Sequence, residues 1–363
     1  MASDNDAKFF DVKPTQTDVD SGKTNRFFYK EYNQAAYANY SKEFKKFSMQ
    51  VGLRGEQTAL RTRQVKGDTS FKRDYFLLFP SAYFNYKLKE TATLGVSVSR
   101  RIDRPGYSAL NPFLTQVDAT IYNTGNPNLK PQMTWSYELS YTVKNMAFTL
   151  GYSRTIDPQN TVLSKILDVI PAFEIKPGQD SNITVQIPVN LESSDYFGLT
   201  ATVPLRISKS WNMINNLNVF YNHFNGALGG VLLNSGAPAV NIRTNNSFTF
   251  KKGWGAEINA NLRSGSRYGY SRFKPQGGID LGAQKTVLQG KGTLRFNMTD
   301  ILWTNRPRVA VTYEGSYIEN WHAFRETRVG TLSFTYRFGS NKVQAARRRA
   351  TASEEEIRRA GGN

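Results

Sequence analysis

The sequence predicts an all-β protein: a transmembrane, antiparallel, up-and-down β-barrel that is incomplete, with about 13–14 strands. Three observations support this fold class: runs of alternating apolar and polar residues, links between the runs that are short and long in turn, and a high content of aromatic residues. No run of about 18 apolar residues occurs, so no transmembrane helix is expected. This criterion does not detect the strands of a membrane barrel, because only every second residue of such a strand faces lipid.

Period-two alternation is the strongest of these signals. Leu139 and Glu138 fall on opposite sides of an extended strand, and so do Ile258 and Asn259. The alternation predicts strands that descend toward one side of the membrane at 28–41, 75–88, 132–143, 191–207, 241–250, 279–288 and 329–338. It predicts ascending strands at 46–62, 91–103, 146–156, 211–224, 254–266 and 293–303.

The links between these runs indicate a membrane barrel rather than a soluble sandwich. Short links lie near 41–46, 88–90, 144–145, 208–210, 251–253 and 289–292. Long links separate them at 63–74, 104–131, 157–190, 225–240, 267–278 and 304–328. Outer-membrane barrels have short periplasmic turns and long extracellular loops, which is the alternation found here.

Aromatic residues make up 13% of the chain, with 19 Tyr and 23 Phe. Such an excess suits β-strands and the aromatic girdles at both membrane boundaries. In the predicted orientation Trp211 and Trp254 lie at the periplasmic boundary, and Trp135 and Trp303 lie at the outer boundary.

Charge and the scarce reactive residues restrict the function. The net charge is +18, but the basic residues are scattered, so nucleic acid is not an expected partner. The chain has no cysteine and two histidines, and neither a metal nor a cofactor is expected. One alternative is a soluble all-β module that binds nucleic acid or glycan. Another is an outer-membrane hydrolase built on His322, for which nearby candidates are Ser316, Glu319 and Glu326. The prediction is that the protein is not an enzyme.

Two stretches carry motifs that resemble a known family. The first contains Arg101, Arg104, Pro105, Asn111 and Pro112, followed by Gly125, Asn126, Pro127, Leu129, Lys130 and Pro131. The second is the final run 332–339, with Tyr336 and Phe338. Over roughly 25–345 the chain resembles the outer-membrane β-barrel proteins of Bacteroidetes, which are related to TonB-dependent receptors. Gln132 departs from the glutamate that usually follows Pro131 in that family.

This resemblance implies a receptor-like or transporter-like barrel portion without its plug, in the outer membrane of a Gram-negative bacterium. Its expected partners are outer-membrane lipid, lipopolysaccharide and the barrel-assembly machinery, to which Tyr336 and Phe338 would present an aromatic signal. Arg101 and Arg104 would either pair with loop carboxylates, which we favour, or bind lipopolysaccharide phosphates. The substrate depends on the shape of the loops and lumen.

The domain organisation follows from where the alternation begins and stops. Residues 1–24 form a polar N-terminal segment, interpreted as the remnant of an extracellular loop. Residues 25–339 form the barrel strands, and 340–363 form a charged periplasmic tail. An odd number of strands cannot close an antiparallel barrel, so further N-terminal strands and a plug are expected upstream. The alternative is that a strand within residues 8–20 closes a small barrel.

Overall fold

The computed structural model describes residues 2–8, 10–12, 14–19, 24–65, 68–171, 173, 175, 182–228, 231–313 and 317–338. A sheet of 14 strands dominates these residues. Its order is β1-β4-β5-β6-β7-β10-β11-β14-β15-β16-β17-β20-β21-β24, and every neighbouring pair is antiparallel. None of the helices in the described residues has the length and apolar character needed to cross a membrane.

Each of the thirteen predicted runs forms a strand of this sheet, and each pairs with the next. The 14 strands are Ala2–Ala7 (β1), Asn25–Glu43 (β4), Phe47–Gln64 (β5), Thr69–Lys89 (β6), Ala92–Asp103 (β7), Gln132–Val143 (β10), Met146–Ile156 (β11), Ser193–Arg206 (β14), Trp211–Leu228 (β15), Val231–Thr249 (β16), Trp254–Arg263 (β17), Gln276–Val287 (β20), Gly292–Met298 (β21) and Gly330–Tyr336 (β24). The predicted all-β, up-and-down class is therefore confirmed.

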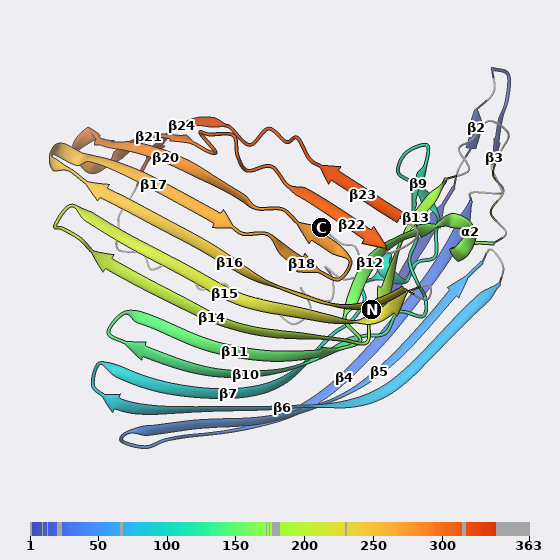
Figure 1. The fold of residues 1–363 in the computed structure, drawn as a ribbon, viewed down its shortest axis with the longest axis horizontal. Coiled ribbons are helices and arrows are strands. Elements are labelled where there is room, and N and C mark those ends of the chain that lie inside the picture. Colours follow the sequence, from blue (N-terminus) through green and yellow to red (C-terminus); the bar gives the residue numbers. More distant parts are fainter. Residues whose placement is uncertain are drawn as a thin grey trace.

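Short turns join the strands at the left end of Figure 1, and the longer loops gather at the right end. Two of these turns contain the 3-10 helices Lys251–Gly253 (η1) and Leu288–Gly290 (η2). Tight turns of this kind need a positive φ, which Gly253 adopts at 75° and Gly290 at 91°. The short links were predicted close to their observed positions. By the rule for outer-membrane barrels this end is periplasmic.

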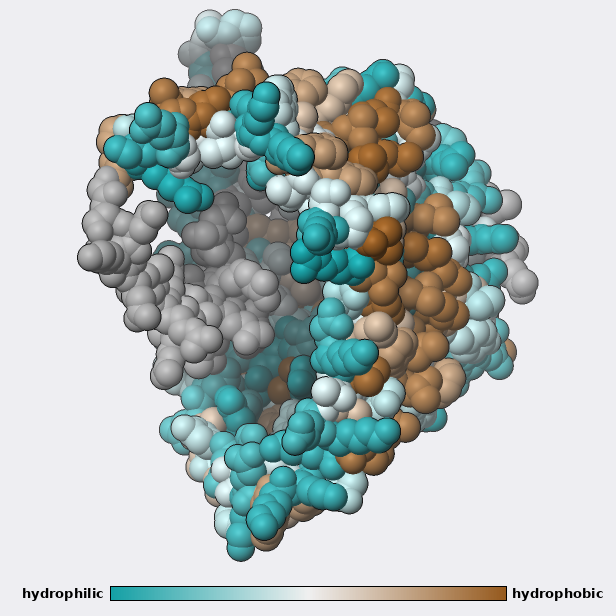
Figure 2. Space-filling model, turned by 90° about the vertical axis from the view of Figure 1, so that its left-hand side faces the viewer, coloured by the Kyte–Doolittle hydropathy of each residue, from teal (hydrophilic) through white to brown (hydrophobic). Residues whose placement is uncertain are grey.

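The cross-strand register separates the residues into two faces. Leu139 lies opposite Val96 on one neighbour and Leu150 on the other, and Ile258 lies opposite Leu281. These apolar residues share the outer face, where Leu139 remains 43% exposed because no protein covers it. Viewed from the short-turn end, the molecule has an apolar band along its outside and a hollow with mostly hydrophilic walls (Figure 2). The predicted alternation of faces is confirmed.

Two of the six predicted long links are wrong. Strands β5 and β6 continue as far as Gln64 and Thr69, and β15 and β16 continue to Leu228 and Val231. Sequence alternation locates the part of a strand that faces lipid. Outside the membrane these hairpins continue without that constraint, so the pattern fades while the hydrogen-bond ladder persists. The predicted strand 293–303 is also too long, since the observed strand β21 ends at Met298.

The remaining four long links carry small elements of their own. One four-stranded sheet contains Thr115–Gln116 (β8), Ile121–Asn123 (β9), Gln159–Lys165 (β12) and Thr184–Asn190 (β13). A second contains Ser266–Tyr268 (β18), Ser271–Phe273 (β19), Arg308–Tyr313 (β22) and Tyr317–His322 (β23). Two single-turn helices, Tyr107–Leu110 (α1) and Ile166–Val169 (α2), complete the loops.

The main sheet does not close into a barrel within the described residues. Strand β24 pairs with β21 and with no other described strand, and β1 pairs only with β4. The fourteenth strand is therefore 2–7 and not a strand from 8–20. Phe10–Val12 (β2) and Thr17–Val19 (β3) instead pair with each other as a separate hairpin. The predicted tail 340–363 lies outside the described residues.

Candidate functional site in the barrel lumen

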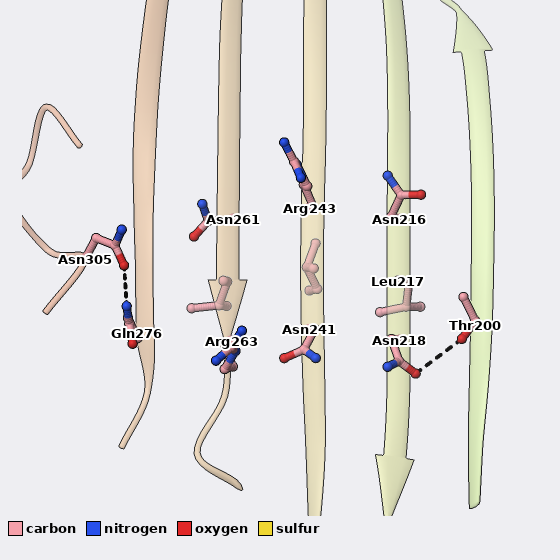
Figure 3. A pocket seen from close by; sticks show the side chains of 12 residues that line it. Thr200, Asn216, Leu217, Asn218, Asn241, Arg243, Asn261, Arg263, Gln276 and Asn305 are labelled. Atoms are coloured by element: carbon pink, nitrogen blue, oxygen red, sulfur yellow. Dashed lines mark hydrogen bonds between the residues drawn. The ribbon is translucent and has the colours of Figure 1, made fainter. Parts of the chain in front are cut away.

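A polar wall lines the inner face of β14, β15, β16, β17 and β20 (Figure 3). Two cross-strand rows form it. In one row Arg243 lies between Asn216 and Asn261. In the other, Asn241 and Arg263 are direct partners, flanked by Asn218 and Gln276. Antiparallel pairing places these side chains next to one another, because directly opposed residues point to the same face. Together with Thr200 and Asn305 they line an open groove of about 490 Å³.

The hydrogen-bonding groups of this polar wall are only partly used within the protein. Thr200 donates to Asn218 Oδ1 at 3.4 Å, and Gln276 donates to Asn305. Asn241 Oδ1 is buried and has no partner among the described residues. A buried acceptor without a donor is costly, so the wall favours a solute or water that supplies one.

The electrostatics of the wall are positive. No carboxylate lines the groove, and neither Arg243 nor Arg263 forms an ion pair with any acidic residue that the structure describes. Each guanidinium carries five N–H donors and no acceptor. The arrangement can hold a polar ligand with an anionic group. The alternation that assigns Asn259 to the polar side of its strand extends to Asn261 and Arg263, two and four residues later. Nothing in the sequence indicates that β16 brings Arg243 beside them.

Arg104 fastens the loop 104–131 to the inner face of β4, β5 and β6. Its guanidinium lies 2.5 Å from Glu56 Oε2, donates to Thr58 Oγ1 and Tyr75 Oη at 3.1 Å each, and lies 4.0 Å from Glu31 Oε1. Burial alone would lower the pKa of Arg104, but the hydrogen bond to Glu56 and the contact with Tyr75 outweigh it and raise that pKa above its usual value. Arg104 therefore remains a cation within the protein.

The second half of the predicted motif closes the same loop. Gly125 N donates to Asn111 O at 2.9 Å, and Asn126 Nδ2 donates to Pro188 O at 3.0 Å. A Cβ at Gly125 would lie 2.5 Å from Asn111 O, so only glycine allows this approach. Leu129 is fully buried in a cluster with Phe27, Tyr29, Leu60, Tyr107 and Leu110. The motif residues thus meet around one loop whose apolar side rests on the first two long strands.

Other predicted residues have peripheral positions. Lys130 Nζ lies 3.4 Å from Asp157 Oδ1, and Pro131 directly precedes β10. Pro105, Pro112 and Pro127 lie in the loop between β7 and β10. Arg101 is exposed on the inner face opposite Thr134. Tyr336 ends β24, and its ring centroid is 4.6 Å from that of Phe338, which is 89% exposed. Their role as an assembly signal stays a prediction.

Comparison with known proteins gives the identity. The chain matches the model of the outer membrane protein beta-barrel family over residues 1–336. This protein belongs to the outer membrane protein β-barrel family. No curated protein matches it. Its place is the outer membrane, as the sequence predicted, and the soluble binding module is not supported.

Solved structures with the same fold are TonB-dependent receptors and a metal transporter. The ferric yersiniabactin uptake receptor FyuA from Yersinia pestis shares 13% identity with a TM-score of 0.58, covering 91% of this chain and 49% of that one. The copper transporter OprC shares 9% identity with a TM-score of 0.60, covering 92% and 52%. The siderophore receptor PirA from Pseudomonas aeruginosa shares 11% identity with a TM-score of 0.53, covering 87% and 61%. This family member spans about half to three fifths of their length.

The described residues contain no assembled catalytic site of the kind that the hydrolase alternative requires. His322 ends β23, and its ring packs edge-on against Phe324 rather than against a carboxylate in that part of the chain. Ser316 lies outside the described residues, as does the side chain of Glu319. The three groups that a hydrolase would need are therefore not seen together.

Proposed function

We propose that this family member forms the barrel portion of an outer-membrane receptor or transporter, and that its polar wall binds anionic, polar solutes in the lumen. The observation that carries the proposal is the pair Arg243 and Arg263, which face the groove without a described acidic partner. Cationic rings select anions in other membrane pores. In the complete receptor the open sheet edges pair with further strands, and a plug fills part of the hollow.

The proposal also accounts for the rigid loop on the opposite side. Arg104, Glu56 and Glu31 hold the loop 104–131 against the inner face of β4 to β6. The loop narrows one side of the outer mouth, while the polar wall of β14 to β20 stays open. A solute that enters from outside is therefore directed toward Arg243 and Arg263. The apolar outer face, in contact with lipid, supplies the insertion energy and takes no part in binding.

Ion selectivity of the full-length protein in planar lipid bilayers tests this function. Under a KCl gradient the reversal potential is expected to show a preference for chloride. Replacing both Arg243 and Arg263 with alanine should remove most of that preference, since both side chains are exposed to the groove and the fold does not depend on them.

The matched control is Lys209→Ala, which removes a positive charge at the short turn between β14 and β15, away from the groove. Its reversal potential should equal that of the parent. A double variant with the parent's chloride preference would contradict the proposed role of the wall.

A further inference from the structure

The loop between β21 and β24 gathers two cations around one tryptophan. Arg306 lies 3.6 Å from the ring centroid of Trp303, and Arg328 lies 5.4 Å from the same centroid. The Arg306 guanidinium also lies 5.6 Å from the ring centroid of Phe324. Cation–π contacts of this kind fix a guanidinium in place while leaving its donors free.

These guanidiniums lack an anionic partner among the described residues. In the ranges that the structure describes, neither Arg306 nor Arg328 forms an ion pair with a carboxylate. In addition, Arg306 Nε is buried and has no hydrogen-bond partner there. A buried donor without an acceptor carries a free-energy cost that an external oxygen atom would remove. Two adjacent guanidiniums match the oxygens of a phosphate group, which accepts paired hydrogen bonds from arginine.

Asp300 holds this loop in shape. Its carboxylate accepts hydrogen bonds from Thr304 N at 2.9 Å, from Asn305 N at 3.0 Å and from Thr327 Oγ1 at 2.6 Å. The bonds join the start of the loop, before Arg306, to its end, before Arg328. Burial would raise the pKa of Asp300, but these hydrogen bonds outweigh it and lower the pKa below its usual value. The carboxylate is thus engaged with its own loop.

A mainly apolar groove of about 370 Å³ borders this loop at Leu302 and Thr304, the two neighbours of Trp303 in sequence. Its other lining residues come from β16, β17 and β20: Ile242, Thr244, Ala260, Asn261, Leu262, Gly277, Gly278 and Ile279. Ile242, Leu262 and Gly277 are direct cross-strand neighbours, and they share the outer face with Ile258 and Leu281. Gly277 contributes no side chain, so the surface is hollowed at this point. The groove therefore opens toward lipid, near the extracellular ends of these strands.

We infer that this groove and its two arginines form a binding site for a phosphorylated glycolipid of the outer leaflet. The phosphate lies between Arg306 and Arg328 beside Trp303, and an acyl chain follows the groove past Leu302. The groove faces lipid, and Arg306 and Arg328 lie near the extracellular boundary of the membrane without a described acidic partner. This combination fits a molecule that has an anionic part and a hydrocarbon part. Trp303, Arg306 and Arg328 do not line the groove of the polar wall, so the inference does not depend on the proposed function.

Binding of diphosphorylated lipid A to the purified full-length protein in phosphatidylethanolamine nanodiscs tests the inference. The parent is expected to bind it more tightly than dephosphorylated lipid A, and added salt should weaken binding. Arg306→Ala with Arg328→Ala should weaken it about tenfold, because charge-assisted hydrogen bonds to phosphate are lost. Arg325→Ala removes an exposed charge from the same loop and should leave binding unchanged.

Two measurements separate the possible sources of an effect. Inorganic phosphate should compete poorly with lipid A, since it has no acyl chain to fill the groove. Heat-modifiable migration on a gel should show that the double variant folds. The inference is wrong if the parent binds phosphorylated and dephosphorylated lipid A equally, a comparison that requires no variant. It is also wrong if Arg325→Ala weakens binding as much as the double variant does.

Discussion

Replacing Arg104 with alanine is expected to lower the free energy of unfolding of the full-length protein by about 3 kcal/mol. The reason is burial: the side chains of Arg104, Glu56 and Glu31 are 12%, 7% and 3% exposed, and the variant leaves the two carboxylates without their shared cation. This value is at the low end of about 3–5 kcal/mol for a broken buried ion pair, because Arg54 still contacts Glu56. Urea unfolding in detergent micelles, followed by tryptophan fluorescence, measures it.

The control for this variant is Arg101→Ala, three residues earlier in the sequence. Arg101 is exposed and forms no ion pair with a described carboxylate, so its loss should change the unfolding free energy by less than about 0.5 kcal/mol. Equal destabilisation by the two variants would show that Arg104 does not fasten the loop.

Replacing Leu139 with arginine is expected to disfavour folding into the membrane by about 2–4 kcal/mol. Leu139 lies on the outer face in the middle part of β10, between Val96 and Leu150, where arginine would meet hydrocarbon. Glu138→Arg places the same side chain on the inner face and should cost much less. Folding titrations into phospholipid vesicles compare the two variants, and an equal cost would contradict the assignment of faces.

The strands were predictable because the membrane imposes one simple rule on every second residue. The bounds predicted for β10 and β11, at 132–143 and 146–156, match the structure residue for residue. The rule does not apply to the parts of the strands outside the membrane, and there the prediction is wrong. The sequence pattern indicates a loop at 63–74, where the hairpin of β5 and β6 continues to Gln64 and Thr69. The first strand, 2–7, has no apolar alternation, and its pairing with β4 depends on backbone hydrogen bonds and the Asp4–Arg26 ion pair.

The candidate site was predictable only in part, because its residues come from several strands and loops that local sequence does not relate to one another. The resemblance to the family pointed to Arg104 and to the Gly125–Asn126 turn, but it did not indicate Glu31 and Glu56, on β4 and β5, as the partners of Arg104. The polar wall needs the register of five strands, and a shift by one residue would turn Arg243 toward the lipid. The parallel contact of β13 with β9 joins two separate long loops and has no counterpart in local sequence.

The central claim is that one face of this sheet contacts lipid and the other contacts water, and single-cysteine labelling tests it most directly. The chain has no cysteine, so a substitution introduces the only thiol. In outer membranes, Asn259→Cys should react readily with a water-soluble maleimide, whereas Ile258→Cys, the adjacent residue on β17, should be protected. Rapid labelling of Ile258→Cys together with protection of Asn259→Cys would contradict the account.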